Sequence, residues 1–118
     1  MSTFGELLRT LRSQAGMSMG DLARQLAVSV PYVSDVERGN RPPLTNARIE
    51  QVASLLHIDS TDLHAAAAAS RGSFELPLPQ NASRLARQVG ASLMRGWSDL
   101  SDEDLGMIEN ILKKKKGV

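Results

Sequence analysis

The stretch Gly16–Pro43, GMSMGDLARQLAVSVPYVSDVERGNRPP, decides the fold of this chain. It holds two short helical patterns on either side of the tight connection Ala27-Val28-Ser29. Two helices joined by so short a turn cross at a steep angle, so that one braces the other and the second projects from the surface. The stretch therefore predicts a helix-turn-helix unit.

Capping residues set the limits of these two helices. Ser18 can cap the first helix, and Asp21 three residues later makes a pair like a capping box. Ser29 can cap the second, where Pro31 lies in the first turn and loses no hydrogen bond. Gly39 ends that helix. The residues expected to face inward are Leu22, Ala23, Leu26, Val33 and Val36.

Three further helices are predicted around this pair. One precedes Gly16, because its apolar residues recur at the spacing of a single helical face. Another follows the extended Arg41-Pro42-Pro43 segment and begins at Thr45 or Asn46. A third begins after Asp59 or Ser60 and includes the alanine run 65–69. Their expected inward residues are Phe4, Leu7, Leu8, Leu11, Ile49, Val52, Ala53, Leu56 and Leu63.

Composition changes at Gly72, where prolines at positions 77 and 79 exclude a helix. We therefore expect a first domain over 1–71, a linker over 72–80 and a helical C-terminal segment over 81–118. A sixth helix begins at Asn81 or Ser83, and a seventh opens with acidic residues from Ser101. Within the linker, Phe74, Leu76 and Leu78 alternate like a short strand or an extended arm.

The last two helices have apolar stripes that need a cover. They can pack back on the fifth helix of the same subunit, or form a two-fold dimer interface, which is the preferred interpretation. The residues expected near the centre of that interface are Leu93, Trp97, Ile108 and Ile111. Lys113 to Lys116 can grip a polyanion, but a solvated helix end that complements the helix dipole is the simpler interpretation.

Composition limits the class of protein. The 118 residues are 42% hydrophobic and 3% aromatic, which suits a core of packed helices. The absence of cysteine excludes disulfides and thiolate sites. No apolar run approaches the roughly 18 residues of a membrane span, and the N-terminus lacks the features of a secretion signal. A soluble cytoplasmic protein is expected. No triad signature or glycine-rich phosphate loop is present, so an enzyme is not expected.

The chain resembles the Xre family of Cro- and phage-repressor-like DNA-binding proteins over roughly Phe4–Leu63. The segments that carry the resemblance are Gly16-Met17-Ser18, Leu22-Ala23, Val28-Ser29, Ser34–Gly39, Pro43, and Ile49 with Val52-Ala53. The resemblance implies an all-α, five-helix lambda-repressor-like domain followed by the linker and two C-terminal helices. It further implies a bacterial or phage transcription regulator, a homodimeric repressor that binds double-stranded DNA at an inverted-repeat operator without a cofactor.

In this family the third helix, here 29–38, reads the major groove. Its base-reading positions are Val30, Pro31, Tyr32, Ser34 and Asp35. Phosphate contacts are implied at Ser18, Met19, Asn40, Arg41, Asn46 and Arg48. Tyr32 better suits phosphate or sugar, while the carboxylate of Asp35 repels the DNA backbone unless it accepts from a cytosine amino group or is held by a nearby arginine. Because the formal net charge is only +1, such a face must arise from how charges are arranged.

Two other features follow from the resemblance. Arg12 and Glu37 occupy the positions of an internal ion pair with a structural role. Met19 replaces the glutamine that relatives place at the start of the second helix, and Ala27 replaces a glycine with positive φ. If the left-handed geometry persists, alanine there costs on the order of 1 kcal/mol.

Two alternatives to the regulator are kept. An antitoxin or adaptor can hold a protein partner, such as a toxin or anti-repressor, through its C-terminal helices, with DNA binding secondary. An enzyme or metal site that uses His57 and His64 is the weaker alternative, because no third ligand is patterned around them. We expect both histidines at the surface and no metal.

Overall fold

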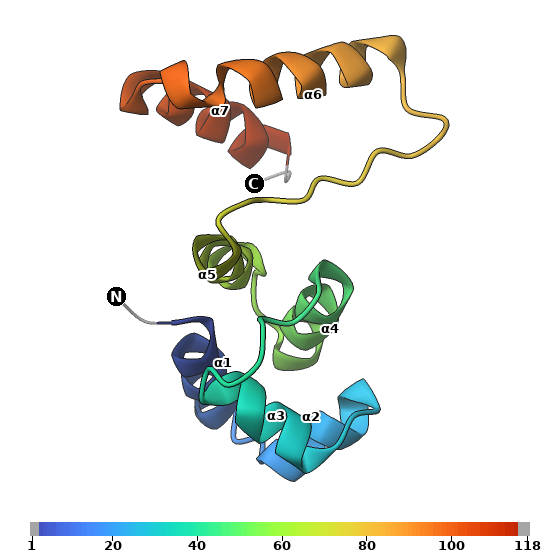
Figure 1. Cartoon of the computed structure of the whole chain (residues 1–118), viewed down its shortest axis with the longest axis vertical. Coiled ribbons are helices and arrows are strands. Elements are labelled where there is room, and N and C mark those ends of the chain that lie inside the picture. The colour runs from blue at the N-terminus through green and yellow to red at the C-terminus, as the bar shows by residue number, and fades with distance from the viewer. Residues whose placement is uncertain (1–2, 116–118) are drawn as a thin grey trace. The chain divides into compact units, whose positions relative to one another are not determined.

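The computed structural model describes residues 3–115, which form α-helices and one short 3-10 helix without any strand (Figure 1). The helices are α1 (Phe4–Gln14), α2 (Met19–Leu26), α3 (Val30–Glu37), α4 (Asn46–Leu56), α5 (Thr61–Arg71), α6 (Arg84–Gly96), the 3-10 helix Trp97–Asp99 and α7 (Asp102–Lys115). The predicted all-α class, with five helices followed by two, is confirmed. Lys116, the last lysine of the predicted basic run, lies outside the described residues.

Side-chain caps decide between the alternative helix starts. Thr45, not Asn46, caps α4, because its hydroxyl accepts a hydrogen bond from the main-chain N–H of Arg48 at 3.3 Å. Ser83, not Asn81, caps α6 in the same way. A Ser or Thr oxygen at this position satisfies one of the N–H groups that a helix start leaves without a partner.

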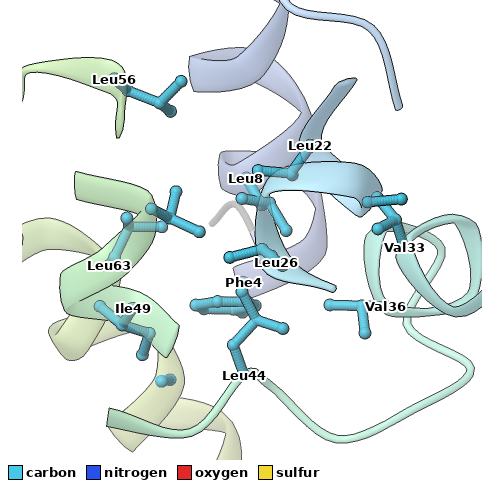
Figure 2. Packing of buried hydrophobic residues seen from close by; sticks show 13 residues of the cluster. Phe4, Leu8, Leu22, Leu26, Val33, Val36, Leu44, Ile49, Leu56 and Leu63 are labelled. Carbon is cyan, nitrogen blue, oxygen red and sulfur yellow. The ribbon is translucent and has the colours of Figure 1, made fainter. Parts of the chain in front are cut away.

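The chain divides into two compact units, one reaching to Glu75 and the other beginning at Leu76. In the first unit, all five helices and the loop before α4 direct apolar side chains into one core (Figure 2). Its largest fully buried side chains are Leu8, Leu22, Val36, Leu44, Ile49, Val52 and Leu63. Helix α3 buries Val33 and Val36 in this core and packs Tyr32 partly against it, while Val30 and Pro31 at its start remain exposed.

Helix α1 holds the end of α3 through a close backbone approach. Gly5 is buried, and a Cβ atom at this position would collide with the carbonyl oxygens of Val36 and Glu37. Glycine is therefore required sterically, although its backbone is helical. The contact fixes the last turn of α3 against α1 and so contributes to the orientation of the whole helix.

The end of α5 and the residues after it are tied to the loop that follows α3 and to the start of α4. Arg71 donates hydrogen bonds from Nη2 to the carbonyl oxygens of Pro43 and Leu44. Asn46 donates from Nδ2 to the carbonyl oxygen of Glu75 at 3.1 Å. These bonds explain why residues up to Glu75 belong to the first unit.

The second unit begins with an irregular segment, and neither Leu76 nor Leu78 is in a strand. None of its described residues is buried. Its exposed large apolar residues are Leu76, Leu78, Leu85, Val89, Met94, Trp97, Met107, Ile111 and Leu112. Over residues 3–115, no helix combines the length and apolar character that crossing a membrane requires.

Candidate nucleic-acid interface

The start of α2 is held by a reciprocal capping box. Ser18 Oγ accepts from the main-chain N–H of Asp21 at 3.0 Å, and Asp21 Oδ2 accepts from the N–H of Ser18 at 3.2 Å. Asp21 Oδ1 also accepts from Arg24 at 2.7 Å. The hydrogen bonds from Ser18, assisted by Arg24, hold the pKa of the Asp21 carboxyl below its ordinary value. The helix that braces α3 is thus fixed at its first turn.

The turn between α2 and α3 is made by a non-glycine residue in the left-handed region. Ala27 has φ 56° and ψ 44°, and its N–H still bonds to the carbonyl oxygen of Arg24 at 3.2 Å. The chain then enters α3 at Ser29, whose hydroxyl accepts from the N–H of Tyr32 at 3.1 Å. Pro31 lies in the first turn of α3. Alanine therefore adopts the geometry that the resemblance assigns to glycine.

The first turn of α3 presents apolar surface to solvent. Val30 is 46% exposed and Pro31 is also exposed, while Tyr32, Ser34 and Asp35 are half-buried. A capped, rigid helix start with exposed methyl and methylene groups is a surface that can contact another molecule. A few exposed apolar residues are common on protein surfaces. The charges beside them therefore indicate which kind of molecule this surface can bind.

Asp35 is held by two arginines on the C-terminal side of this turn. Its Oδ1 pairs with Arg38 Nη2 at 3.2 Å, and its Oδ2 pairs with Arg41 Nε at 3.6 Å. Both carboxylate oxygens are therefore occupied. Of the two roles left open for Asp35, the one held by nearby arginines is the one that this geometry matches.

Tyr32 is approached by two arginines that come from different parts of the chain. The guanidinium carbon of Arg41 lies 5.1 Å from the ring centroid, and that of Arg48 lies 5.5 Å away. Arg48 Nη1 also donates to the Tyr32 hydroxyl at 3.3 Å. These distances allow cation–π contacts, which orient both guanidinium groups. We call Tyr32, Arg41 and Arg48 the arginine–tyrosine cluster.

The remaining candidate phosphate contacts differ in what they can donate. Ser18 and Asn40 are exposed at the start of α2 and just after α3. The side chain of Met19 packs against the hydrophobic core and has no N–H or O–H donor, so only its main-chain N–H can meet a phosphate. Asn46 already donates from Nδ2 to Glu75, although an amide carries a second N–H.

A buried ion pair between Arg12 and Glu37 holds the end of α3 against α1. Arg12 Nε and Nη2 donate to the two carboxylate oxygens of Glu37 at 2.7 and 3.0 Å, and Nη1 donates to the carbonyl oxygen of Met17 at 2.8 Å. The two residues are only 8% and 7% exposed. The hydrogen bonds that Arg12 donates to the Glu37 carboxylate raise the pKa of Arg12 above its ordinary value. This pair joins α1, the segment before α2 and the end of α3.

Sequence reasoning missed Arg38 as a member of the charged surface. It follows Asp35 by three residues on a helix, and this spacing brings two side chains together. That spacing was a usable signal. The approach of Arg48 to Tyr32 had no such signal, because it depends on how α4 packs beside α3.

The two histidines lie at the end of α4 and in α5. His57 is exposed and ends α4 with φ 56°. His64 Nε2 lies 2.7 Å from Glu50 Oε2, and hydrogen bonds from Ser60 and His64 hold the pKa of the Glu50 carboxyl below its ordinary value. Within the described residues, no group of three or more His, Asp or Glu side chains is placed to hold a metal ion.

The expected dimer residues lie on the second unit with unequal exposure. Trp97 is 51% and Ile111 is 59% exposed, whereas Leu93 and Ile108 are half-buried. Leu93 also lines a shallow groove of about 370 Å³ with Val89, Gly96 and Leu100.

Comparison with known proteins shows which family and which relatives this chain is similar to. The family profile described as "Helix-turn-helix domain" matches residues 3–67. The HTH-type transcriptional regulator DdrOP3 of Deinococcus deserti is 39% identical over 59 residues, which are 50% of this chain and 43% of that protein. The uncharacterized HTH-type transcriptional regulator Rv0474 of Mycobacterium tuberculosis is 38% identical over 60 residues, 51% of this chain and 42% of that protein. The match thus spans less than half the length of each relative.

A solved structure described as a SinR protein/SinI protein complex shares the fold over more of the chain. The alignment covers 98% of this chain and 100% of the matched chain, with 19% identity and a TM-score of 0.50. At this identity the likeness concerns the fold alone. It extends to the helices after residue 80, which the family profile does not reach.

Proposed function

Because the chain belongs to the helix-turn-helix domain family, we propose that it is a sequence-specific DNA-binding transcription regulator that inserts α3 into the major groove. One observation carries the proposal: the exposed first turn of α3 lies beside a set of arginines contributed by α3, the following loop and α4. Apolar and small polar groups suit base edges, and guanidinium groups suit the phosphates beside them. Such a regulator works in the cytoplasm, on the nucleoid.

The two parts of the surface have separate tasks in this proposal. Val30 and Pro31 offer methyl and methylene groups to a thymine methyl, and the hydroxyl of Ser34 can pair with several bases. Arg41, Arg48 and the Tyr32 hydroxyl contact phosphates and fix the register of α3 on the duplex. The supporting phosphate contacts are Ser18, Asn40, Asn46 and the main-chain N–H of Met19.

We further propose that the protein acts as a homodimeric repressor. In this arrangement residues 1–71 bind DNA, 72–80 link and 81–118 dimerise, with Leu93, Trp97, Ile108 and Ile111 in the interface. A two-fold dimer matches an inverted-repeat operator whose half-sites are about 34 Å apart or a multiple of that distance. The exposed apolar residues of the second unit support the dimer, because such surface is usually covered.

Selection of bound fragments from a random DNA library tests the proposal directly. We expect an enriched inverted repeat, with log affinity falling against log salt at a slope of about −5 or steeper if six or more phosphates are neutralised. Replacing Val30 or Ser34 should change the recovered sequence. Recovery of no common sequence, with an affinity that does not respond to salt, would overturn the proposal.

An adaptor or antitoxin that holds a protein through its C-terminal unit is the second candidate. The observation that favours it is the same exposed apolar surface, which includes Leu85 and Val89 on α6. A full-length chain that self-associates and shifts DNA in a sequence-dependent way supports the regulator. A chain that stays monomeric, shows no sequence preference and forms a defined heterocomplex supports the adaptor.

A further inference from the structure

An exposed stripe runs along one face of α7. Met107 and Ile111 are four residues apart on this helix and are 63% and 59% exposed. Asp104 precedes Met107 by three residues, and Lys114 follows Ile111 by three. Spacings of three, four and three keep four residues on one helical face. We call Asp104, Met107, Ile111 and Lys114 the α7 stripe.

The α7 stripe is distinct from the other faces of the helix. Leu105 and Ile108 are half-buried and lie on a neighbouring face of the helix. Lys113 lies on the opposite side, where its Nζ is 3.4 Å from Glu109 Oε1 of the same helix. The stripe is therefore a second apolar face, and residues of its own unit leave it exposed.

The order of residues along the stripe is acidic, apolar, apolar, basic. A two-fold axis at Glu109 that sets two α7 helices antiparallel brings position 104 opposite 114 and position 107 opposite 111. Each acidic residue then faces a lysine, and each apolar residue faces an apolar one. Layers of this kind are how antiparallel coiled helices pair. The stripe is thus complementary to itself.

We propose that a second copy of this chain covers the α7 stripe, with Asp104 of each subunit paired to Lys114 of the partner subunit. Met107 of each subunit then packs on Ile111 of the partner subunit. This inference rests on the homodimer of the proposed function and names the contact that sets its geometry. The other exposed apolar residues of the second unit add area to the same dimer.

The helix dipole alone does not account for this pattern. Acidic residues at a helix start and basic residues at its end are favoured on any helix. The dipole does not, however, require them to lie in line with two exposed apolar residues. Asp104 also accepts from the main-chain N–H of Ser101 through Oδ2 at 3.1 Å, which fixes its side chain at the helix start and leaves Oδ1 outside that bond.

The first test compares two lysine substitutions in the full-length chain by sedimentation equilibrium. Lys114→Glu places like charges opposite each other twice in the dimer, so we expect its dissociation constant to rise by about tenfold. Lys113→Glu is the matched control, because it changes the same charge at the same helix end but off the stripe. It also loses the Glu109 pair, so any general damage to α7 should be at least as large.

The second test restores the pairing between two damaged chains. Asp104→Lys alone should also weaken the dimer, whereas Asp102→Lys, which lies off the stripe, should not. Mixing the Asp104→Lys chain with the Lys114→Glu chain should give a heterodimer about tenfold tighter than either homodimer. Mixing does not change the stability of either helix, so loss of the Asp104 cap cannot produce this result.

The outcomes distinguish failure of the proposed α7 pairing from failure of the homodimer. A wild-type chain that remains monomeric overturns both the homodimer and the α7 pairing. A wild-type dimer that Lys114→Glu and Lys113→Glu weaken equally, or mutant chains that do not pair on mixing, overturns the α7 pairing and leaves the homodimer standing.

Discussion

Arg41 stacks against Tyr32, with its guanidinium carbon 5.1 Å from the centroid of the ring. The contact joins the loop after α3 to the helix proposed to read DNA, and Arg48 approaches the same ring from α4. A guanidinium held in this way loses little further freedom when it contacts a phosphate. The arginine–tyrosine cluster is therefore suited to set the position of α3 on the duplex.

The first prediction is that Arg41→Ala weakens binding to all DNA sequences by the same factor. A phosphate contact carries no base information, so the preferred operator should not change. We expect about a tenfold loss of affinity and a salt slope smaller by about one. Gel shifts on several operators at three salt concentrations measure both. Arg9→Ala is the control, because Arg9 lies on the exposed surface of α1. If Arg41→Ala changed the preferred DNA sequence, Arg41 would have to read bases.

Asp35→Asn tests whether Asp35 orients the neighbouring arginines or contacts a base directly. Both oxygens of Asp35 are paired with arginines, so we expect it to hold Arg38 and Arg41 and not to contact a cytosine. Removing its charge should then tighten binding to all sequences by a few-fold, with a salt slope steeper by about one. Loss of discrimination at a single base pair, measured by competition with substituted operators, would assign Asp35 a direct base contact.

The pair formed by Arg12 and Glu37 should matter for stability before it matters for specificity. Either alanine substitution leaves the other charge buried without a partner, so the free energy of unfolding should fall by about 3–5 kcal/mol. Urea unfolding measures this loss. Arg24→Ala breaks the exposed pair with Asp21 and should cost below about 1 kcal/mol. Equal losses for the buried and the exposed pair would contradict the structural role.

Much of the first unit could be predicted from the sequence because its signals are local. Ser18 and Ser29 could be recognised as caps from the residues around them, and the buried stripe of α2 follows from helical spacing. The choice of Thr45 over Asn46 as the cap of α4 could not, because adjacent polar residues give equivalent signals. The loop geometry, not the residue type, decides which hydroxyl or amide reaches the free N–H groups.

The electrostatic part of the site was less accessible to sequence reasoning. Asp35 with Arg38 is a local pair, but the approach of Arg48 to Tyr32 spans 16 residues and depends on helix packing. The bond from Asn46 to Glu75 spans 29 residues and includes a main-chain oxygen, which has no signature in the sequence. Long-range contacts of this kind follow from the tertiary fold and not from spacing.

Ala27→Gly should stabilise the first unit. Ala27 has φ 56°, where a Cβ atom is unfavourable, and glycine removes that strain at the cost of more freedom in the unfolded chain. We expect a net gain of about 0.5–1 kcal/mol in the free energy of unfolding. Ala15→Gly is the matched control, because Ala15 has φ −82° and glycine relieves no strain there. A stabilisation of both variants, or of neither, would contradict the strain at Ala27.

The last prediction concerns acid. Hydrogen bonds from Ser18 hold the pKa of Asp21 below its ordinary value in the folded chain, whereas in the unfolded chain it lies at about 3.9. The folded chain therefore takes up this proton less readily than the unfolded chain. The capping box contributes its full stabilisation to the folded state above about pH 3.9, the unfolded-state pKa of Asp21. As the pH falls further toward the folded-state pKa, the contribution is lost.

Urea unfolding at pH 7 and pH 3 should show a smaller loss of stability for Asp21→Asn than for the wild-type chain. Asparagine keeps an acceptor for the Ser18 N–H but cannot take up the proton, so it removes this part of the pH dependence. Glu50→Gln should remove a separate part, since hydrogen bonds from Ser60 and His64 lower the pKa of Glu50 as well. The effects of the two substitutions should add, because they act on different helices. A wild-type pH dependence in Asp21→Asn would show that the capping box does not depend on the charge of Asp21.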